Sequence, residues 1–538
     1  MGAAVSETLT VVDGRAGAKP RLRLAELVAA LSLGIDLGFG QPMEHVLRQC
    51  LIALRLGDLL GLSEDQRLAV YYSALLIDVG CHTDAHEQAK WFGDDIAGRA
   101  TKYDYDMRSL AGAVQGVRLL GSGNQPLHRL RIGVEFLLYG HKDVDGMVES
   151  HSQLARSLAR EIGLPQSVQE AVAAAYERWD GRGWPGELKG EAIPLAARLA
   201  QFAEFIEVAH RTGGVAAARS LARERAGAQF DPQLAGLLDA HAEQILGDLD
   251  ESPSWKEVIA AEPSLRITLT HEQADDALLG VADFIDLKSP YTLGHARAVA
   301  DLAAGAGRRL GLGPEDLAVT RRAALVHGFG RLGVSNAIWD KPGPLAAGER
   351  ERVRLHPYLT ERMLYQSQWL APLGTIAVQL RERLDGSGYP RGLNGSAISG
   401  PARILAAADV YQSMIEPRPH RPARTPEHSA AELRGEVRAG RLDGDAVEAV
   451  LAAAGHDGVR RRDYPAGLTS REVDVLRLLA RGLSSRQISE QLVISPKTAR
   501  NHIEHIYTKI GATSRVTASL FAVQNGLLPE QQLAAQDA

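Results

Sequence analysis

The chain repeats itself over two long segments, and this internal duplication constrains its fold more than any other feature. In each copy a histidine is followed by a Gly-Leu pair, then by an apolar run that ends in glycine, and later by an Asp-Gly-x-Gly-x-Pro turn. The matching positions are His45, Gly61, Gly80 and Asp180 in the first copy and His295, Gly311, Gly330 and Asp385 in the second. There are only two copies, and their period is far longer than the roughly 20 to 50 residues of solenoid repeats, so we expect two tandem domains.

The two copies differ in length. The spacing from the histidine to the glycine after the apolar run is the same in both, but the stretch from His45 to Asp180 is about 45 residues longer than that from His295 to Asp385. We place the extra residues in the polar segment around 91–123 of the first copy.

Composition and periodicity predict an all-α fold. Alanine and leucine dominate, aromatic residues make up only 5%, and apolar residues recur at the three- and four-residue intervals of amphipathic helices. The net charge of −6 excludes a chain that is basic overall, so any nucleic-acid-binding surface must be local. Cys50 and Cys81 do not make a disulfide framework, and no apolar run reaches the ~18 residues of a membrane span. We therefore expect a cytoplasmic protein with no membrane partner.

The turn of the second copy carries a specific motif. Asp385-Gly-Ser-Gly-Tyr-Pro390 follows an expected helix, and Arg418-Pro-His-Arg421 lies downstream. Together they resemble the HD-GYP branch of the HD phosphohydrolases, which the second copy matches well and the first more weakly. The resemblance implies an all-α fold, two or three bound metal ions and hydrolysis of cyclic di-GMP.

The resemblance also implies a set of metal ligands in the second copy. Imidazole and carboxylate ligands suit iron, manganese or zinc, and a carboxylate shared by two ions lets them activate a hydroxide. The ligands that carry over to this sequence are His295, His327, His356 and Asp409.

Neither copy keeps the whole ligand set. The bridging aspartate of the family falls on Gly328, its lysine on Arg331, and its paired histidines on Leu380 and Arg381, where a cation replaces a ligand. The corresponding departures in the first copy fall on Ile77, Cys81, Ala175, Tyr176 and Glu204. We therefore expect a degenerate HD-like region that acts as a sensor.

The sequence leaves open a second metal cluster at Cys81, His82, Asp84 and His86, since a thiolate beside two imidazoles is a suitable ligand set. A polar loop at the end of a helix explains the same residues more simply. The remaining histidines, including His151, show no regular spacing, and we expect them to be ordinary surface or core residues.

The last seventy residues predict four short amphipathic helices. Thr469 and Glu472 form a capping box for the first helix, Ser495 before a proline caps the third, and Ser514 caps the fourth. The third helix places a row of apolar side chains on one face and polar side chains, including Arg500, on the other. Such a polar face is suited to reading base edges in the major groove.

From 466 to 531 the segment resembles the LuxR-type helix-turn-helix, in its opening Leu-Thr-x-Arg-Glu, its Ser-Pro-x-Thr turn and its closing Lys-Ile-Gly. The resemblance implies a dimer contact through the last helix. It also implies base contacts from Arg500, Asn501 and Glu504, and phosphate contacts from Arg486, Lys497, Thr498 and Lys509.

The chain therefore divides into a disordered tail (1–20), two HD-like units (21–250 and 265–457), a basic linker (458–465) and a helix-turn-helix domain (466–531). We expect a transcriptional regulator that binds double-stranded DNA as a homodimer and whose HD-like region senses a small molecule or nucleotide. The alternative is a metal-dependent phosphohydrolase acting on a nucleotide or cyclic dinucleotide, with a DNA-binding tail that localises it.

Overall fold

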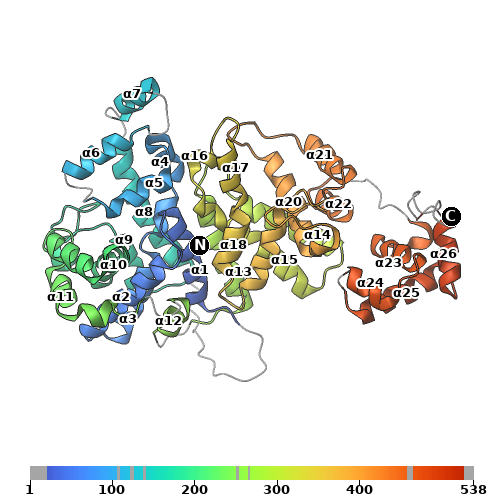
Figure 1. The fold of residues 1–538 in the computed structure, drawn as a ribbon, viewed down its shortest axis with the longest axis horizontal. Helices are drawn as coiled ribbons and strands as arrows, with labels where there is room; N and C mark the ends of the chain where they lie inside the picture. The colour runs from blue at the N-terminus through green and yellow to red at the C-terminus, as the bar shows by residue number, and fades with distance from the viewer. Residues whose placement is uncertain are drawn as a thin grey trace, which may run out of the picture.

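The computed structural model describes residues 21–105, 110–121, 126–136, 141–249, 254–263, 267–456, 464–492, 494–525 and 527. Within these ranges every regular element is a helix, which confirms the predicted all-α class. The predicted tail and most of the predicted basic linker lie outside the described residues. Figure 1 shows three groups of helices, with α1 to α12 on one side, α13 to α22 in the middle and α23 to α26 at the opposite end.

In the residues that the structure describes, the first unit consists of α1 to α12 and the short 3-10 helices η1, η2 and η4. Its elements are α1 (Leu24–Gly38), α2 (His45–Leu59), α3 (Glu64–Leu76), η1 (Val79–His82), α4 (Ala85–Phe92), α5 (Asp95–Ala100), η2 (Thr101–Tyr103), α6 (Leu110–Leu119), α7 (Pro126–Glu135), α8 (His141–Glu161), α9 (Gln166–Ala173), η4 (Gly190–Ala192), α10 (Leu195–Arg225), α11 (Pro232–Leu246) and α12 (Ser254–Ala260).

The second unit repeats this order with a shorter connection in its middle. Its elements are α13 (His271–Asp286), α14 (His295–Arg309), α15 (Pro314–Val326), η5 (Phe329–Gly333), α16 (Asn336–Trp339), α17 (Ala347–Arg354), α18 (His356–Leu364), α19 (Ala371–Ala377), η6 (Val378–Arg381), η7 (Gly395–Ala397), α20 (Gly400–Ile415), α21 (Pro426–Arg438) and α22 (Gly444–Ala453). Between η5 and α18 lie only α16 and α17, whereas α4 to α7 lie between η1 and α8.

The duplication is visible in matching hydrogen bonds. At the start of α2 the Val46 N–H donates to Asp36 Oδ1 at 3.0 Å, and at the start of α14 the Ala296 N–H donates to Asp286 Oδ2 at 2.7 Å. Each carboxylate satisfies a backbone donor that a helix N-terminus leaves without an internal partner.

A second matching pair fixes the helix that follows the Gly-rich turn. Arg198 Nη1 donates to Asp231 Oδ2 at 2.6 Å in the first unit, and Arg403 Nη1 donates to Asp443 Oδ2 at 2.9 Å in the second. Such charge-assisted bonds tie α10 to α11 and α20 to α22 in the same way. The structure therefore contains two tandem HD-like units, as predicted.

The two units share one continuous hydrophobic core. Helix α1 lies at their junction, where Gly34 faces the side chains of Met363 and Leu332, and Leu37 packs on Gly333. A Cβ on Gly34 would lie 2.4 Å from the Met363 methyl carbon, so the absence of a side chain allows α1 to contact the second unit closely.

The C-terminal helices α23 (Ser470–Ala480), α24 (Ser485–Leu492), α25 (Pro496–Ile510) and α26 (Arg515–Gln524) have a separate core. The predicted capping box is present, since the Glu472 N–H donates to Thr469 Oγ1 at 3.2 Å and the Thr469 N–H donates to Glu472 Oε2 at 2.7 Å. Ser495 and Ser514 cap α25 and α26 as predicted. In the part of the chain that the structure describes, no helix has the length and apolar character that crossing a membrane requires.

Candidate functional site

The second unit brings His295, His327 and Asp409 together at the centre of its helices. His295 begins α14, His327 follows the last turn of α15, and Asp409 lies within α20. All three are buried, and one ligand atom from each lies within 4.8 Å of the others. Asp409 Oδ1 is 3.2 Å from His295 Nε2 and 3.6 Å from His327 Nε2.

Arg381 forms an ion pair with the second carboxylate oxygen of Asp409. It is the last residue of η6, and its Nη2 atom lies 2.9 Å from Asp409 Oδ2. Burial raises the pKa of Asp409, but the charge of Arg381 and the nearby imidazoles of His295 and His327 hold that pKa well below its usual range. As the sequence indicated, a permanent cation lies where the family has a histidine ligand.

The fourth predicted ligand, His356, lies outside this cluster. Its Nδ1 atom bonds to the Val353 carbonyl at 2.7 Å, and its Nε2 atom is buried without a hydrogen-bond partner. The ring packs edge-on against Trp339, with 5.4 Å between the ring centroids. Burial and the charge of Arg381 lower the pKa of His356 well below its ordinary value, so this imidazole is neutral at physiological pH.

These residues do not fit the binuclear centre of the family. Gly328 has no side chain, so the bridging carboxylate is missing. The three clustered residues could hold a single ion, because His327 Nε2 is buried without a hydrogen-bond partner. That metal ion would have to bind Asp409 while Arg381 also pairs with this carboxylate. The positive charge of Arg381, 2.9 Å from Asp409 Oδ2, would repel the metal ion.

In the first unit a lysine fills the equivalent centre. Lys102 of η2 lies 2.9 Å from both carboxylate oxygens of Asp78, and it also pairs with Glu204. Its ammonium group lies 4.3 Å from the centre of the Phe39 ring. Burial and the charge of Asp78 raise the pKa of Glu204 to about 8. The positive charge of Lys102 therefore neutralises the negative charge of Asp78, while Glu204 keeps its proton at neutral pH.

Cys81, His82 and His86 do not form the metal cluster that the sequence left open. Both ring nitrogens of His82 bond to backbone carbonyls, at 2.8 and 2.9 Å. His86 points to the second unit, where its Nδ1 atom lies 2.8 Å from Asp340 Oδ2. Neither histidine joins a metal cluster among the described residues, but the predicted polar loop is wrong, because His82 lies in η1 and His86 in α4.

Cys81 instead contacts His151, a histidine for which the sequence predicted no particular role. His151 of α8 is buried, and it corresponds to His356 of α18. The backbone of each histidine packs against the glycine of the preceding 3-10 helix, Gly80 or Gly330. The signal was present in the sequence, because His151 lies as far before Asp180 as His356 lies before Asp385.

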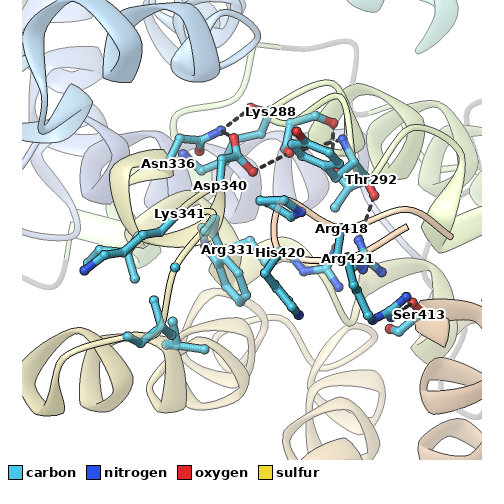
Figure 2. Close-up of a pocket in the computed structure, with 18 of the residues that line it drawn as sticks. Lys288, Thr292, Arg331, Asn336, Asp340, Lys341, Ser413, Arg418, His420 and Arg421 are labelled. Atoms are coloured by element: carbon cyan, nitrogen blue, oxygen red, sulfur yellow. Dashed lines mark hydrogen bonds between the residues drawn. The ribbon is translucent and has the colours of Figure 1, made fainter. Parts of the chain in front are cut away.

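A cavity of about 320 Å³ adjoins the centre of the second unit (Figure 2). Its lining is strongly basic, with Asp340 as its only carboxylate among the described residues. The aromatic residues Tyr291 and Trp339 complete the wall. The cationic residues that line it are Lys288, Arg331, Lys341, Arg381, Arg418 and Arg421.

Two of these guanidinium groups have unsatisfied donors. Arg331 Nε and Nη1 and Arg381 Nε are buried without a hydrogen-bond partner. Burial and the charge of Arg331 lower the pKa of Arg418 to about 10, which reflects the crowding of positive charge. Buried donors without partners are unusual in folded proteins, so this arrangement favours an anionic ligand.

Residues of the first unit support one wall of the cavity. Asp95 of α5 accepts a hydrogen bond from the Asn336 N–H at 2.8 Å and lies 3.6 Å from Lys288 Nζ. His86 of α4 bonds to Asp340, as described above. Lys288, Asn336 and Asp340 all line the cavity and lie side by side in Figure 2.

The C-terminal domain presents the expected polar face on α25. Ala499 and Ile506 are buried, whereas Arg500, Asn501 and Glu504 are exposed. The phosphate-contact candidates differ in their surroundings. Lys497 and Thr498 are exposed at the start of α25, Arg486 pairs with Glu490 at 3.2 Å, and Lys509 Nζ lies 2.7 Å from Glu472 Oε2.

Two family models match the chain. The HD domain matches residues 142–234 and 280–446, and the luxR family of bacterial regulatory proteins matches residues 466–522. Both agree with the resemblances seen in the sequence.

Curated relatives include three bacterial phosphodiesterases. The chain is 33% identical over 408 residues to 3′3′-cGAMP-specific phosphodiesterase 3 of Vibrio cholerae, covering 74% of this chain and 88% of that protein. It is 32% identical over 211 residues to 3′3′-cGAMP-specific phosphodiesterase 1 of the same organism, covering 39% of this chain and 47% of that protein. It is also 32% identical over 183 residues to the cyclic di-GMP phosphodiesterase response regulator RpfG of Xanthomonas campestris, covering 34% and 48%.

A solved structure is similar over most of the chain. The crystal structure of a cyclic GMP-AMP specific phosphodiesterase of V. cholerae is 28% identical, with a TM-score of 0.57, and the match covers 81% of this chain and 98% of that one. The chain therefore belongs to the HD-domain family of the V. cholerae 3′3′-cGAMP-specific phosphodiesterase 3, and it carries a C-terminal domain of the luxR family of regulatory proteins.

Proposed function

We propose that this protein is a cytoplasmic, DNA-binding transcriptional regulator whose HD region binds a cyclic dinucleotide without hydrolysing it. The observation that carries the proposal is the internal cation in each HD unit, Arg381 on Asp409 and Lys102 on Asp78. These side chains supply the positive charge that metal ions supply in the active members of the family. The HD fold is kept because these cations balance the buried carboxylates, but the metal ions that would activate a hydroxide are replaced.

The basic cavity supports a phosphate-bearing ligand. A phosphodiester would satisfy the unpartnered N–H groups of Arg331 and Arg381 and relieve the repulsion around Arg418. Tyr291 and Trp339 offer aromatic faces for a nucleobase. The relatives named for 3′3′-cGAMP and cyclic di-GMP suggest which nucleotides to test first.

The DNA-binding role rests on the luxR-family domain and on the exposed face of α25. Helix α26 leaves Val516, Leu520 and Val523 exposed by 76%, 54% and 47%, which is an apolar stripe at helical spacing. We infer that this stripe pairs with a second copy, and that the homodimer binds a two-fold symmetric DNA site.

Isothermal titration calorimetry with 3′3′-cGAMP and cyclic di-GMP tests the ligand. We expect saturable binding of at least one of them. Arg331→Gln should weaken that binding by about tenfold or more, because it removes a charge-assisted bond to phosphate. Arg391→Gln is the matched control, since Arg391 is 45% exposed and pairs with Glu361 away from the cavity.

A mobility-shift assay with and without the bound dinucleotide then tests whether the ligand changes DNA affinity. Failure of both dinucleotides to bind the wild-type protein would reject the ligand assignment. Loss of binding in both arginine variants would mean that Arg331 has no specific role. DNA binding by the wild-type protein that does not depend on ligand would reject the sensory role alone.

The alternative function is a metal-dependent phosphohydrolase, which the cluster of His295, His327 and Asp409 favours. Plasma mass spectrometry of protein purified without a metal-binding tag measures the metal content directly. Hydrolysis of bis-p-nitrophenyl phosphate with manganese or anaerobic iron, abolished by His327→Ala, would establish this function. Substoichiometric metal and no turnover would exclude it.

A further inference from the structure

The first unit contains a cysteine inside a cluster of polar side chains. Cys81 Sγ lies 3.7 Å from His151 Nδ1, and His151 Nε2 lies 2.8 Å from Asp84 Oδ2. The Tyr176 hydroxyl is 2.7 Å from the sulfur. The three groups are arranged as in an activated nucleophile. The Cys81 thiol is the nucleophile, the His151 imidazole beside it is the activating group, and the Asp84 carboxylate orients the imidazole.

Groups that donate hydrogen bonds or carry positive charge surround the thiol. Burial and the charge of Cys81 raise the pKa of Tyr176 well above its ordinary value, so the phenol keeps its proton and donates to the sulfur. Burial lowers the pKa of His151, but the charge of Cys81 and the hydrogen bond to Asp84 raise it to about 10, so the imidazole is protonated at neutral pH. The Lys102 ammonium also interacts electrostatically with Cys81.

The second cysteine provides an internal contrast. Cys50 is fully buried in the hydrophobic core, where its thiol donates to the Tyr71 carbonyl at 3.6 Å. Burial raises the pKa of Cys50 well above its ordinary value, which leaves it an unreactive thiol. Cys81 keeps 7% of its surface exposed, so only a small reagent can reach it.

We propose that Cys81, His151 and Asp84 form a reactive thiol site whose reaction partner is a hydroperoxide. Burial of the sulfur excludes bulky electrophiles, whereas hydrogen peroxide is about the size of two water molecules. The site is separate from the basic cavity of the second unit, and it does not depend on the function proposed for that cavity.

The reaction balances with these groups alone. The Cys81 thiolate attacks one oxygen of the peroxide, so that an S–O bond forms as the O–O bond breaks. The departing hydroxide takes the proton of the His151 imidazolium and leaves as water. The sulfur loses two electrons, which the peroxide gains, and the product is a sulfenic acid. Asp84 orients His151 during the transfer and accepts no proton.

The test is sulfenic-acid trapping in the full-length protein. The folded protein is exposed to hydrogen peroxide for increasing times, and the peroxide is then removed with catalase. The protein is next unfolded in urea with dimedone, so that the label on each cysteine peptide, measured by mass spectrometry, reports the sulfenic acid formed in the folded state. We expect Cys81 to be labelled at least about tenfold faster than Cys50. Asp84→Asn should slow the labelling of Cys81 by about tenfold, because His151 then loses the carboxylate that holds its proton.

Asp104→Asn is the matched control, since Asp104 is an exposed carboxylate in the same connection. It should react at the wild-type rate. Equal labelling of the two cysteines, or labelling of Cys81 that does not rise above that of a sample never treated with peroxide, would overturn the proposal. Equal rates for Asp84→Asn and Asp104→Asn would also overturn it, because the triad would then have no role in the reaction.

Discussion

Arg381 is the residue whose replacement most directly tests the idea of an internal cation. Arg381→Ala leaves the charge of Asp409 in an interior where the carboxylate is fully buried. With an effective dielectric constant of about 20, two unit charges 2.9 Å apart attract each other by about 6 kcal/mol. Solvation of the separated groups offsets part of this attraction, and we expect the variant to lose about 3–5 kcal/mol of unfolding free energy.

The pH dependence of this loss has a definite sign. The pKa of Asp409 is depressed in the folded protein, so the stabilisation is complete above the unfolded value of about 3.9 and disappears only as the pH falls further. The variant should therefore be destabilised throughout the neutral range. The difference from wild type should shrink in acid, where the carboxylate is protonated.

Urea unfolding followed by tryptophan fluorescence measures the effect, because Trp339 and Trp369 both lie in the second unit. Arg391→Ala is the control, since the pair of Arg391 with Glu361 is partly exposed and should contribute about 0–1 kcal/mol. Equal destabilisation by the two substitutions at pH 7 would refute the reasoning. Arg381 would then be a surface residue rather than the counterion of a buried carboxylate.

Three further predictions concern the two HD centres and the DNA-binding domain. Arg381→His removes the cation and restores the histidine of the family, so the variant should take up about one divalent ion per chain by plasma mass spectrometry; equal uptake by the wild-type protein would contradict this. In the folded protein Glu204 keeps its proton up to about pH 8, whereas an unfolded chain releases it near 4.3, so the wild-type protein should lose stability as the pH rises through this window. Glu204→Gln should flatten that decline in thermal unfolding between about pH 5 and pH 8, and an unchanged slope would exclude Glu204 as its cause. In fluorescence anisotropy, Arg500→Ala should weaken binding to a specific DNA site far more than binding to random DNA. Lys497→Ala should weaken binding to both DNAs and flatten the slope of log affinity against log salt concentration by about 1. Equal losses on both DNAs for the Arg500 variant would mean that Arg500 does not contact bases.

Most of the secondary structure and the repeat could be predicted from the sequence because both depend on local pattern. Apolar residues at helical spacing give the all-α class, and identical intervals between matched residues give the two units. The capping box of Thr469 and Glu472 was predictable in detail, since its two hydrogen bonds join residues three positions apart. The substitution of Arg381 for a ligand was also visible, although its bond to Asp409 was not.

Only the tertiary structure decided which charged groups meet. Lys102 reaches Asp78 and Glu204 from a connection that the second unit lacks, and no sequence pattern marks it as the cation of that centre. Cys81 meets His151 across 70 positions of the chain, and the packing of the helices leaves Arg331 Nε and Nη1 buried without hydrogen-bond partners. Helix periodicity fixes which face of a helix is buried, but the partner of a buried charge depends on how distant helices pack together.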